Sequence, residues 1–507
     1  MLDLLPLSPT WVLAGLFAVL SYWFLVWPFS TFKKLGIPGP KPVPLFGNYL
    51  GYRKGMGNFD QECYQKYNKV YGFFEGQQPI LMVGDLKLVR EITVKKTNIF
   101  QNRRDLAGRG EIFGASVAAL KDDDWKRVRG VISPTFSTGK LKQMSPHLER
   151  CAANFISKLD ENCQDGTVFD MKKLTGAFSL DVTSSTAFGV DVDSLNNPDN
   201  PLVWSAKNMF DFSFYNPLVL IVILFPQLAW ILEFCGVNFM NKKSITYFSD
   251  AVDHAINMKR EVSDKERPPD FLQLALAAHN EELDNGVSAN TAKWGISKKE
   301  IKGNAVLFWA AGYESTSNTI ALTAYNLALH QEAQDRCIEE IDAVIKKHGV
   351  LDYKAIHELP YLEMCINETL RIFPSTTRID RVAKEDVDLD GIRIPAGMLV
   401  FVPVWSIHMD ADIWPEPEEF RPERFSKEAV AARDPYAYLP FGSGPRNCAG
   451  MRLSLLELRF SLAKALEKFR FVTCKETVIP VRFKKSMLNQ IDHEVWLKVE
   501  ARTPTHA

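Results

Sequence analysis

The sequence predicts a mainly helical protein with small β-sheets, preceded by a single N-terminal transmembrane helix. Most of the 507 residues repeat apolar side chains at helical spacing. Only two stretches, 69–83 and 394–404, carry β-like apolar and aromatic runs between glycine and proline turns. No Gly-x-Gly-x-x-Gly motif follows a strand, so we expect neither a doubly wound α/β fold nor a nicotinamide or flavin bound by this chain itself.

The composition is that of a globular protein with a large core, because 46% of the residues are hydrophobic and 24% are charged. No low-complexity linker divides the chain, which favours one large domain beside the membrane segment. A net charge of −1 identifies no partner by itself, and we expect no nucleic acid to bind. The eight cysteines are scattered without a Cys-x-x-Cys pair, which favours a reducing compartment.

The apolar run at residues 11–29 predicts a membrane anchor, because it is long enough for a short transmembrane helix and carries tryptophans near both ends. Asp3 and the absence of an early lysine argue against a cleaved signal peptide. Lys33 and Lys34 follow the run, so the positive-inside rule places the remaining chain in the cytosol. We therefore expect residues 1–30 to be the anchor, and a buried core helix is the alternative.

Two further segments bear on the membrane. Residues 31–48 include a run of prolines that cannot form a regular helix, which predicts a stiff hinge before one large domain at 49–507. A second apolar and aromatic run, 210–239, is interrupted by Pro226 and is too short to span a bilayer. We interpret it as a lid that covers an apolar pocket and dips into the membrane surface, with core packing as the alternative.

A long helix is predicted to begin at Ser297, which forms a capping box with Glu300, and to end near His330. Gly312 lies in its middle, on one stripe with Ser315. A glycine there costs up to about 1 kcal/mol relative to alanine. We infer that it lets a ligand approach the helix backbone.

One cysteine lies in the glycine-rich turn 441–450, and helical spacing resumes at 451–469. A thiolate at Cys448 is favoured by the free N–H groups and the positive end of that helix. Gly444 and Gly450 are expected to let the backbone approach whatever the anion binds. The arrangement suits a large planar metal cofactor bound by Cys448. The alternative is that Cys448 is a buried cysteine with a structural role only.

The fixed residues of this turn have a spacing that is highly specific for one known sequence signature. Phe-x-x-Gly-x-Arg-x-Cys-x-Gly resembles the haem-thiolate signature of the cytochrome P-450 superfamily, and its fixed positions are Phe441, Gly444, Arg446, Cys448 and Gly450. Segments such as SPTFSTGKLKQM and DPYAYLPFGSGPRNCAGMR look like the animal microsomal family 3, which includes the 3A drug- and steroid-oxidising branch. The resemblance runs from the hinge to the C-terminus and implies the P-450 fold and a haem b whose axial ligand is the Cys448 thiolate.

The resemblance also implies where the haem propionates bind. Trp125 and Arg129 share a helical face and match the family's Trp-x-x-x-Arg motif. Arg381 and Arg446 match two further propionate partners, and Arg103 or Arg104 is a third candidate.

Residues 311–316 resemble the oxygen-activating segment of the family, where an acid normally precedes a threonine. Here the acid is Glu314 and the next residue is Ser315. The hydroxyl remains but the methyl group is lost, so the side chain is less restricted. We expect oxygen activation with more uncoupling, and Thr316 partly substituting as a proton relay.

The pair Glu368 and Arg371 matches the family's Glu-x-x-Arg motif, and Arg424 lies in the matching Pro-Glu-Arg-Phe segment. The resemblance implies a buried ionic network that fixes the haem-side core. It also places the substrate pocket at Ala118, Phe214, Phe308, Ala310, Ser375, Thr376, Met487 and Leu488.

The resemblance implies a monooxygenase anchored in the endoplasmic reticulum membrane that inserts one atom of O₂ into steroids and xenobiotics. NADPH electrons would arrive from a separate reductase, with cytochrome b5 as a second partner, at a basic face formed by Lys121, Lys126, Arg127, Lys140 and Lys142. Two alternatives are a reductase-independent haem-thiolate isomerase or dehydratase and a non-enzymatic haem sensor. The pair Glu314 and Ser315 argues against the isomerase or dehydratase. The predicted lid together with that pair argues against the haem sensor.

Overall fold

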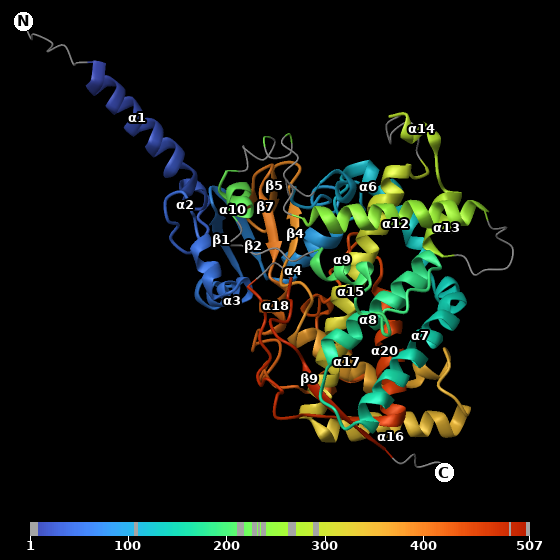
Figure 1. The fold of residues 1–507 in the computed structure, drawn as a ribbon. Coiled ribbons are helices and arrows are strands. Elements are labelled where there is room, and N and C mark those ends of the chain that lie inside the picture. Colours follow the sequence, from blue (N-terminus) through green and yellow to red (C-terminus); the bar gives the residue numbers. More distant parts are fainter. Residues whose placement is uncertain are drawn as a thin grey trace, which may run out of the picture.

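A computed structural model describes residues 9–105, 110–209, 217–225, 231, 234, 240–261, 270–286, 294–485 and 488–502. Helices predominate and the strands form small sheets, as the sequence predicts (Figure 1). The helices are α1 Pro9–Leu25, α2 Thr31–Lys34, α3 Met56–Tyr67, α4 Leu86–Arg90, α5 Glu111–Gly114, α6 Asp122–Ile132, α7 Thr138–Gln164, α8 Met171–Thr183, α9 Pro201–Asn208, α10 Pro217–Leu224, α12 Lys242–Glu261, α13 Phe271–Ala277, α14 Glu281–Asp284, α15 Lys298–Leu329, α16 Gln331–His348, α17 Pro360–Ile372, α18 Val404–His408, α19 Lys427–Ala432 and α20 Met451–Lys468. The strands are β1 Val70–Glu75, β2 Gln78–Val83, β3 Phe169–Asp170, β4 Ile379–Val382, β5 Val387–Leu389, β6 Ile392–Ile394, β7 Leu399–Val402, β8 Phe469–Val472 and β9 Trp496–Ala501.

The two predicted β regions meet in one four-stranded sheet of order β1-β2-β7-β4. β1 and β2 form an antiparallel hairpin over 70–83, and β7 lies parallel to β2 and antiparallel to β4. The predicted run 394–404 is shorter than expected, because a turn with Gly397 at φ +80° separates β6 from β7. The sheet of order β3-β9-β8 was not anticipated.

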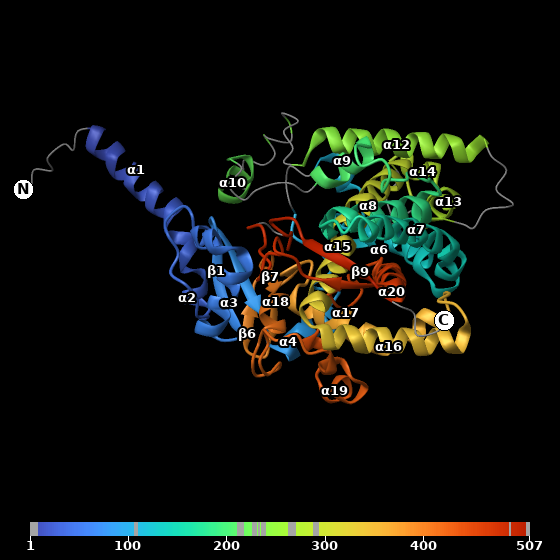
Figure 2. The same ribbon diagram turned by 60° about the horizontal axis from the view of Figure 1, so that its bottom comes forward.

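The long helix α15 confirms the predicted capping box. The Ser297 side chain accepts a hydrogen bond from the Glu300 N–H, and the Ser297 N–H donates to Glu300 Oε2 at 2.8 Å. The helix ends before His330 and runs through the helical part of the molecule, in contact with α8, α12, α17 and α20 (Figures 1 and 2). α15 is buried on nearly every face. The stripe that includes Gly312 and Ser315 is therefore not the only side of the helix that faces inward.

The structure gives Gly312 a reason other than the predicted approach of a ligand. A Cβ at this position would lie 2.5 Å from Thr183 Oγ1 and 3.3 Å from Thr183 Cγ2, at the end of α8. Such a distance is far below normal van der Waals contact, and the β-branched Thr183 side chain is buried. The missing methyl group therefore lets α15 pack closely against α8.

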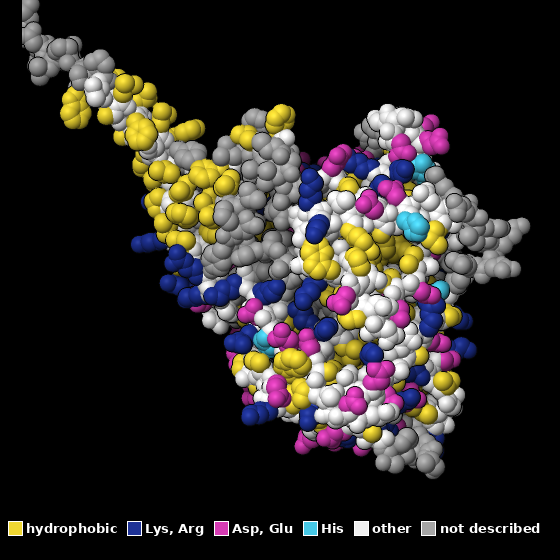
Figure 3. Space-filling model, in the orientation of Figure 1, with side chains coloured by type: hydrophobic (Ala, Val, Ile, Leu, Met, Phe, Trp, Pro, Cys, Tyr) yellow, Lys and Arg dark blue, Asp and Glu magenta, His cyan; other side chains and the backbone are white. Residues whose placement is uncertain are grey.

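The N-terminal apolar segment is helical but bent. α1 ends at Leu25, and the 3₁₀ helix Trp27–Ser30 and α2 follow it. No single helix among the described residues is long and apolar enough to cross a membrane, and the one candidate is the pair Thr10–Trp23 and Trp27–Lys34, bent by 43°. Apolar side chains nevertheless cover α1, which projects away from the domain (Figure 3).

The first residues of the predicted hinge, 31–34, form α2, whereas the proline-containing residues 35–48 are irregular and lie against the sheet, because the Gly72 N–H donates to Pro38 O at 2.8 Å. Within the predicted lid 210–239 the structure describes only 217–225, 231 and 234, so most of that prediction lies outside the described residues. The part that is described, α10, packs against the hairpin turn, since a Cβ on Gly76 would lie 2.8 Å from Ile223 O.

We predict that Gly312→Ala lowers the free energy of unfolding by about 1–3 kcal/mol, because the added methyl group overpacks the contact with Thr183. In a Thr183→Ala background most of this cost should disappear, which urea denaturation of the four variants in a double-mutant cycle can measure. Gly139→Ala on α7 is the control, since nothing lies within 4 Å of its Cβ position. An equal cost in both backgrounds would show that Thr183 is not the obstacle.

Candidate functional site

The turn 441–450 is held by its own backbone. The Cys448 N–H donates to Phe441 O at 2.9 Å, and the Asn447 N–H donates to Gly444 O at 3.0 Å. Gly442 and Gly444 both adopt φ +73°, a conformation that favours glycine. These contacts set Cys448 just before α20, which begins at Met451 as predicted.

Gly444 and Gly450, which were both expected to let a ligand approach the backbone, differ in the space around their Cβ positions. A Cβ on Gly444 would lie 1.7 Å from Thr93 O, so this glycine is required for packing against the neighbouring segment Glu91–Lys95. Nothing lies within 4 Å of the Cβ position of Gly450. Only Gly450 therefore leaves open space beside the cysteine.

The side chain of Cys448 is solvent-accessible, yet burial raises the pKa of its thiol. The N–H groups of Gly450 and Met451 and the charges of Arg129 and Arg103 oppose this rise in pKa. Ala311, in the middle of the otherwise buried α15, is exposed as well.

Arginines gather beside the cysteine turn. Arg446 lies over the Trp125 ring, with its Cζ 4.2 Å from the ring centre, and donates to three backbone carbonyls. Arg103 Nη2 donates to the Arg446 carbonyl at 3.3 Å, and Arg129 Nη2 donates to Asn447 Oδ1 at 2.9 Å. The three carbonyls belong to Gln101, Val117 and Leu120.

This arginine cluster carries more positive than negative charge. Burial, Arg103 and Arg381 lower the pKa of Arg446 to about 9, and burial and Arg103 lower the pKa of Arg381 to about 10. Asp380 is the acid that opposes both shifts. Arg103 Nε is buried without a partner among the described residues. The cluster formed by Arg103, Arg129, Arg381 and Arg446 therefore suits a ligand with more than one carboxylate.

Of the two candidates considered for a further contact, the structure places Arg103 in the cluster. Arg104 forms an ion pair with the buried Glu75, away from the turn.

The three polar residues expected to activate oxygen have separate partners. Glu314 accepts a hydrogen bond from Asn318 Nδ2 at 3.0 Å and lies 3.6 Å from Lys172 Nζ. Ser315 Oγ donates to Ala311 O at 2.7 Å within the helix. Thr316 is buried, and its Oγ1 lies 3.1 Å from Ser454 Oγ on α20, so this hydroxyl links two helices.

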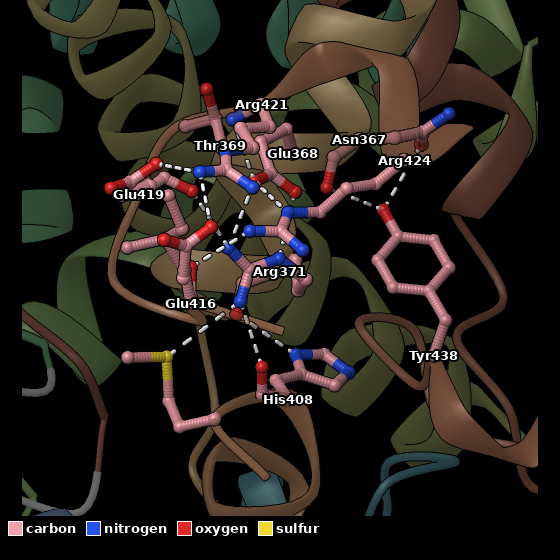
Figure 4. Close-up of polar contacts among 12 residues, drawn as sticks. Asn367, Glu368, Thr369, Arg371, His408, Glu416, Glu419, Arg421, Arg424 and Tyr438 are labelled. Carbon is pink, nitrogen blue, oxygen red and sulfur yellow. Dashed lines mark hydrogen bonds and ion pairs between the residues drawn. The ribbon is translucent and has the colours of Figure 1, made fainter. Parts of the chain in front are cut away.

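Figure 4 shows the predicted acid–arginine network assembled around Glu368. Glu368 Oε2 accepts from Arg371 Nε at 2.7 Å, and both side chains are 0% exposed. Glu368 Oε1 accepts from Arg371 Nη2 at 2.8 Å, from Arg424 Nε at 3.2 Å and from the Arg421 N–H at 3.0 Å. Arg371 Nη1 also donates to His408 O at 2.8 Å. The carboxylate thus joins α17 to the segment that leads to the cysteine turn.

Comparison with known proteins identifies the family. The family model described as "Cytochrome P450" matches residues 37–498. This chain belongs to the cytochrome P450 family. Cytochrome P450 3A2 of Rattus norvegicus is 43% identical over 97% of both chains, cytochrome P450 3A29 of Sus scrofa is 41% identical over 99% of both, and cytochrome P450 3A30 of Fundulus heteroclitus is 42% identical over 93% of this chain and 94% of the relative.

As a cytochrome P450, the chain is a haem-thiolate monooxygenase that uses O₂ and a reductase to oxidise lipophilic substrates. The residues present fit this cofactor. Haem carries two propionates, which would match the surplus of arginine charge, and the accessible sulfur of Cys448 is the kind of soft ligand that iron accepts.

The predicted pocket positions fall into several groups. Thr376 pairs with Leu488 in an isolated antiparallel bridge, and the Asn489 N–H donates to Ser375 O at 3.0 Å, so these two distant segments lie side by side. Phe308 is half-buried against Phe136 and Phe271, and Ala118 is half-buried. Ala310 is fully buried, and the accessible surface belongs to the next residue, Ala311. Phe214 and Met487 lie outside the described residues.

The predicted basic docking face needs a correction. Arg127 is buried, and its guanidinium donates to Glu300 at 2.6 and 2.9 Å and to Asp124 at 2.8 Å. It is therefore part of the contact between α6 and α15. Lys126 is exposed, and its one ion pair within the described part of the chain is with the exposed Asp123 at 3.0 Å.

Sequence reasoning missed some residues of the site. The side-chain Oδ1 of Asn447 holds Arg129, and the backbone carbonyls of Gln101, Val117 and Leu120 hold Arg446. Backbone acceptors carry no sequence signal. Asp380 could have been found, because an acid directly before Arg381 is the nearest source of opposite charge.

We predict that Arg371→Ala yields protein that does not retain haem. Removing Arg371 leaves the buried Glu368 carboxylate short of two charge-assisted hydrogen bonds, at a cost of about 3–5 kcal/mol. The pyridine haemochromogen absorbance and the reduced-CO difference spectrum measure the retained cofactor. Lys347→Ala is a matched control, because its ion pair with Glu358 is exposed and contributes little. A normal reduced-CO spectrum from Arg371→Ala would contradict the prediction.

Proposed function

We propose that this chain oxidises steroids and xenobiotics at the endoplasmic reticulum membrane, with Cys448 as the axial ligand of haem b. The observation that carries the proposal is the arginine cluster next to an accessible cysteine. Arg103, Arg129, Arg381 and Arg446, with Trp125, would hold the propionates. When bound, the haem supplies the chemistry that activates O₂, and a thiolate ligand favours O–O cleavage.

The chain's own residues would control protons and water. Ser315 and Glu314 lie beside Ala311, and the Ser315 hydroxyl needs only to exchange its bond to Ala311 O for one to water to relay a proton. Lys172 and Asn318 hold the Glu314 carboxylate. Thr316 would have to leave Ser454 to act, which makes it the weaker substitute.

Substrates would contact the segments brought together at Ser375, Thr376 and Leu488, with Ala118, Phe308, Ala310, Phe214 and Met487 as further candidates. The mostly apolar character of this set favours lipophilic molecules.

The division of the chain is part of the proposal. Residues 1–30 would anchor the protein in the phospholipid membrane as a single-pass segment, 31–48 would be the hinge and 49–507 the cytosolic catalytic domain. The exposed apolar side chains of α1 support this, together with the lysines at the end of α2. NADPH–haemoprotein reductase, and cytochrome b5 as a second donor, would dock near Lys121, Lys126, Lys140 and Lys142.

Reconstitution tests the proposed function. Product formation from a panel of steroids and bulky lipophilic drugs should require NADPH, reductase and O₂ together, and Cys448→Ser should abolish the thiolate signature in the reduced-CO spectrum. Trp204→Ala is the control for this spectrum. It changes an exposed residue away from the turn and should leave the thiolate signature in place. Turnover without reductase would instead favour an isomerase or dehydratase.

We predict that Ser315→Thr lowers the peroxide released per NADPH consumed. The added methyl group restricts χ1 and keeps the hydroxyl in fewer positions. Peroxide, product and NADPH are measured in the same reaction. Ser315→Ala is the matched comparison and should raise peroxide release. If Ser315→Thr releases the same amount of peroxide per NADPH consumed as the unmodified enzyme, the serine does not cause uncoupling.

A further inference from the structure

A pocket of about 440 Å³ opens on the surface between α19, the residues 413–415 and Leu86. One wall comes from α19, which projects from the lower edge of the molecule in Figure 2. The volume lies in the range of small-molecule sites. None of the residues that line the pocket belongs to the cysteine turn or to the arginine cluster, so it is separate from the haem site.

The walls of this pocket are mostly apolar and two arginines line it. The apolar side chains are Leu86, Ile413, Pro415, Ala429, Ala432 and Ala437. Arg433 lies over the Trp414 ring, with its Cζ 4.0 Å from the ring centre, and its Nη1 donates to Arg424 O at 2.9 Å. Arg433 forms no ion pair among the described residues, and the acid whose charge acts on it, Glu368, is already paired with Arg371 and Arg424.

The charge balance around the pocket is positive. Arg371 and Arg424 share the single carboxylate of Glu368, and Arg433 adds a third guanidinium. Asp434 also lines the pocket, but it is exposed and its carboxylate caps the Tyr436 N–H at 2.8 Å. The acids Glu416 and Glu419 are already paired with Arg421.

An unpaired donor lies in the same wall. Trp414 is 1% exposed, and its Nε1–H has no hydrogen-bond partner among the described residues. A buried N–H without a partner costs free energy, so a polar ligand atom that reached it would be favoured. The Trp414 ring also has Arg371 over it at 5.2 Å, which connects the pocket to the network around Glu368.

We propose that this pocket binds a small organic anion, a compound with one carboxylate or sulfonate group and a compact apolar body. The anionic group pairs with Arg433, which presents a planar guanidinium suited to two parallel hydrogen bonds. The apolar body packs between Ala429, Ala432 and Ile413. The volume of about 440 Å³ and the mostly apolar walls favour such a molecule, because a compact apolar body can fill the hollow while its anionic group reaches Arg433.

Calorimetric titration of the holoenzyme tests this proposal, with the haem pocket saturated by a tight azole ligand so that only other sites are observed. The probes are 1-naphthoate and the neutral 1-naphthamide, which share an apolar body. We expect naphthoate to bind at least about tenfold more tightly than the amide, with an affinity that falls as salt rises. Arg433→Gln should remove this preference. Arg393→Gln, which changes an exposed arginine paired with Asp386, should leave it unchanged.

A second variant keeps the proposal testable if Arg433→Gln fails to fold. Ala432→Phe fills the pocket and keeps both arginines, so it should weaken both probes at least about tenfold. Equal binding of naphthoate and naphthamide, unchanged naphthoate binding in both pocket variants, or no binding at millimolar naphthoate would overturn the proposal. Reductase binding that depends on Arg433 while naphthoate binding does not would assign the pocket to a protein partner and would also overturn it.

Discussion

The concentration of positive charge beside Cys448 is the constraint on which the rest of the site depends. Buried guanidinium groups are stable only when anions or hydrogen-bond acceptors surround them. Here backbone carbonyls satisfy Arg446, and Asp380 offers the nearest opposing charge. A haem with two propionates would correct the remaining imbalance, and binding of the cofactor would then stabilise this region.

The network around Glu368 shows the opposite arrangement, because every strong acceptor position of its carboxylate is used. Two arginines and one backbone N–H bind it, and neither Glu368 nor Arg371 is exposed. A buried charge pair gives little net stability but strongly penalises any arrangement that breaks it. The network thus fixes how α17 meets the 416–425 segment, and the chain runs from that segment directly into the cysteine turn.

The sequence was informative wherever the signal is local. The limits of α15 follow from a capping box, and the cysteine turn follows from a spacing of ten residues. It was misleading where the deciding partner is distant in the chain. Gly312 and Gly444 looked like ligand-facing glycines, but Thr183 and Thr93 occupy the space that a side chain would need. Arg127 looked like part of a basic surface, but Glu300, 173 residues away, buries and neutralises it.

The same reasoning applies to the two hydroxyls that follow Glu314. Their spacing alone makes Ser315 and Thr316 equivalent candidates for a proton relay. The structure separates them, since among the described residues the Ser315 hydroxyl bonds only to a carbonyl of its own helix, whereas the Thr316 hydroxyl forms a contact between α15 and α20. A hydroxyl that holds two helices together can move to a new partner only by weakening their packing, but one that is bonded within its own helix turn can rotate without that cost. Ser315 is therefore the hydroxyl that can turn to a new partner at the lower cost, and it is also the position where the chain carries serine.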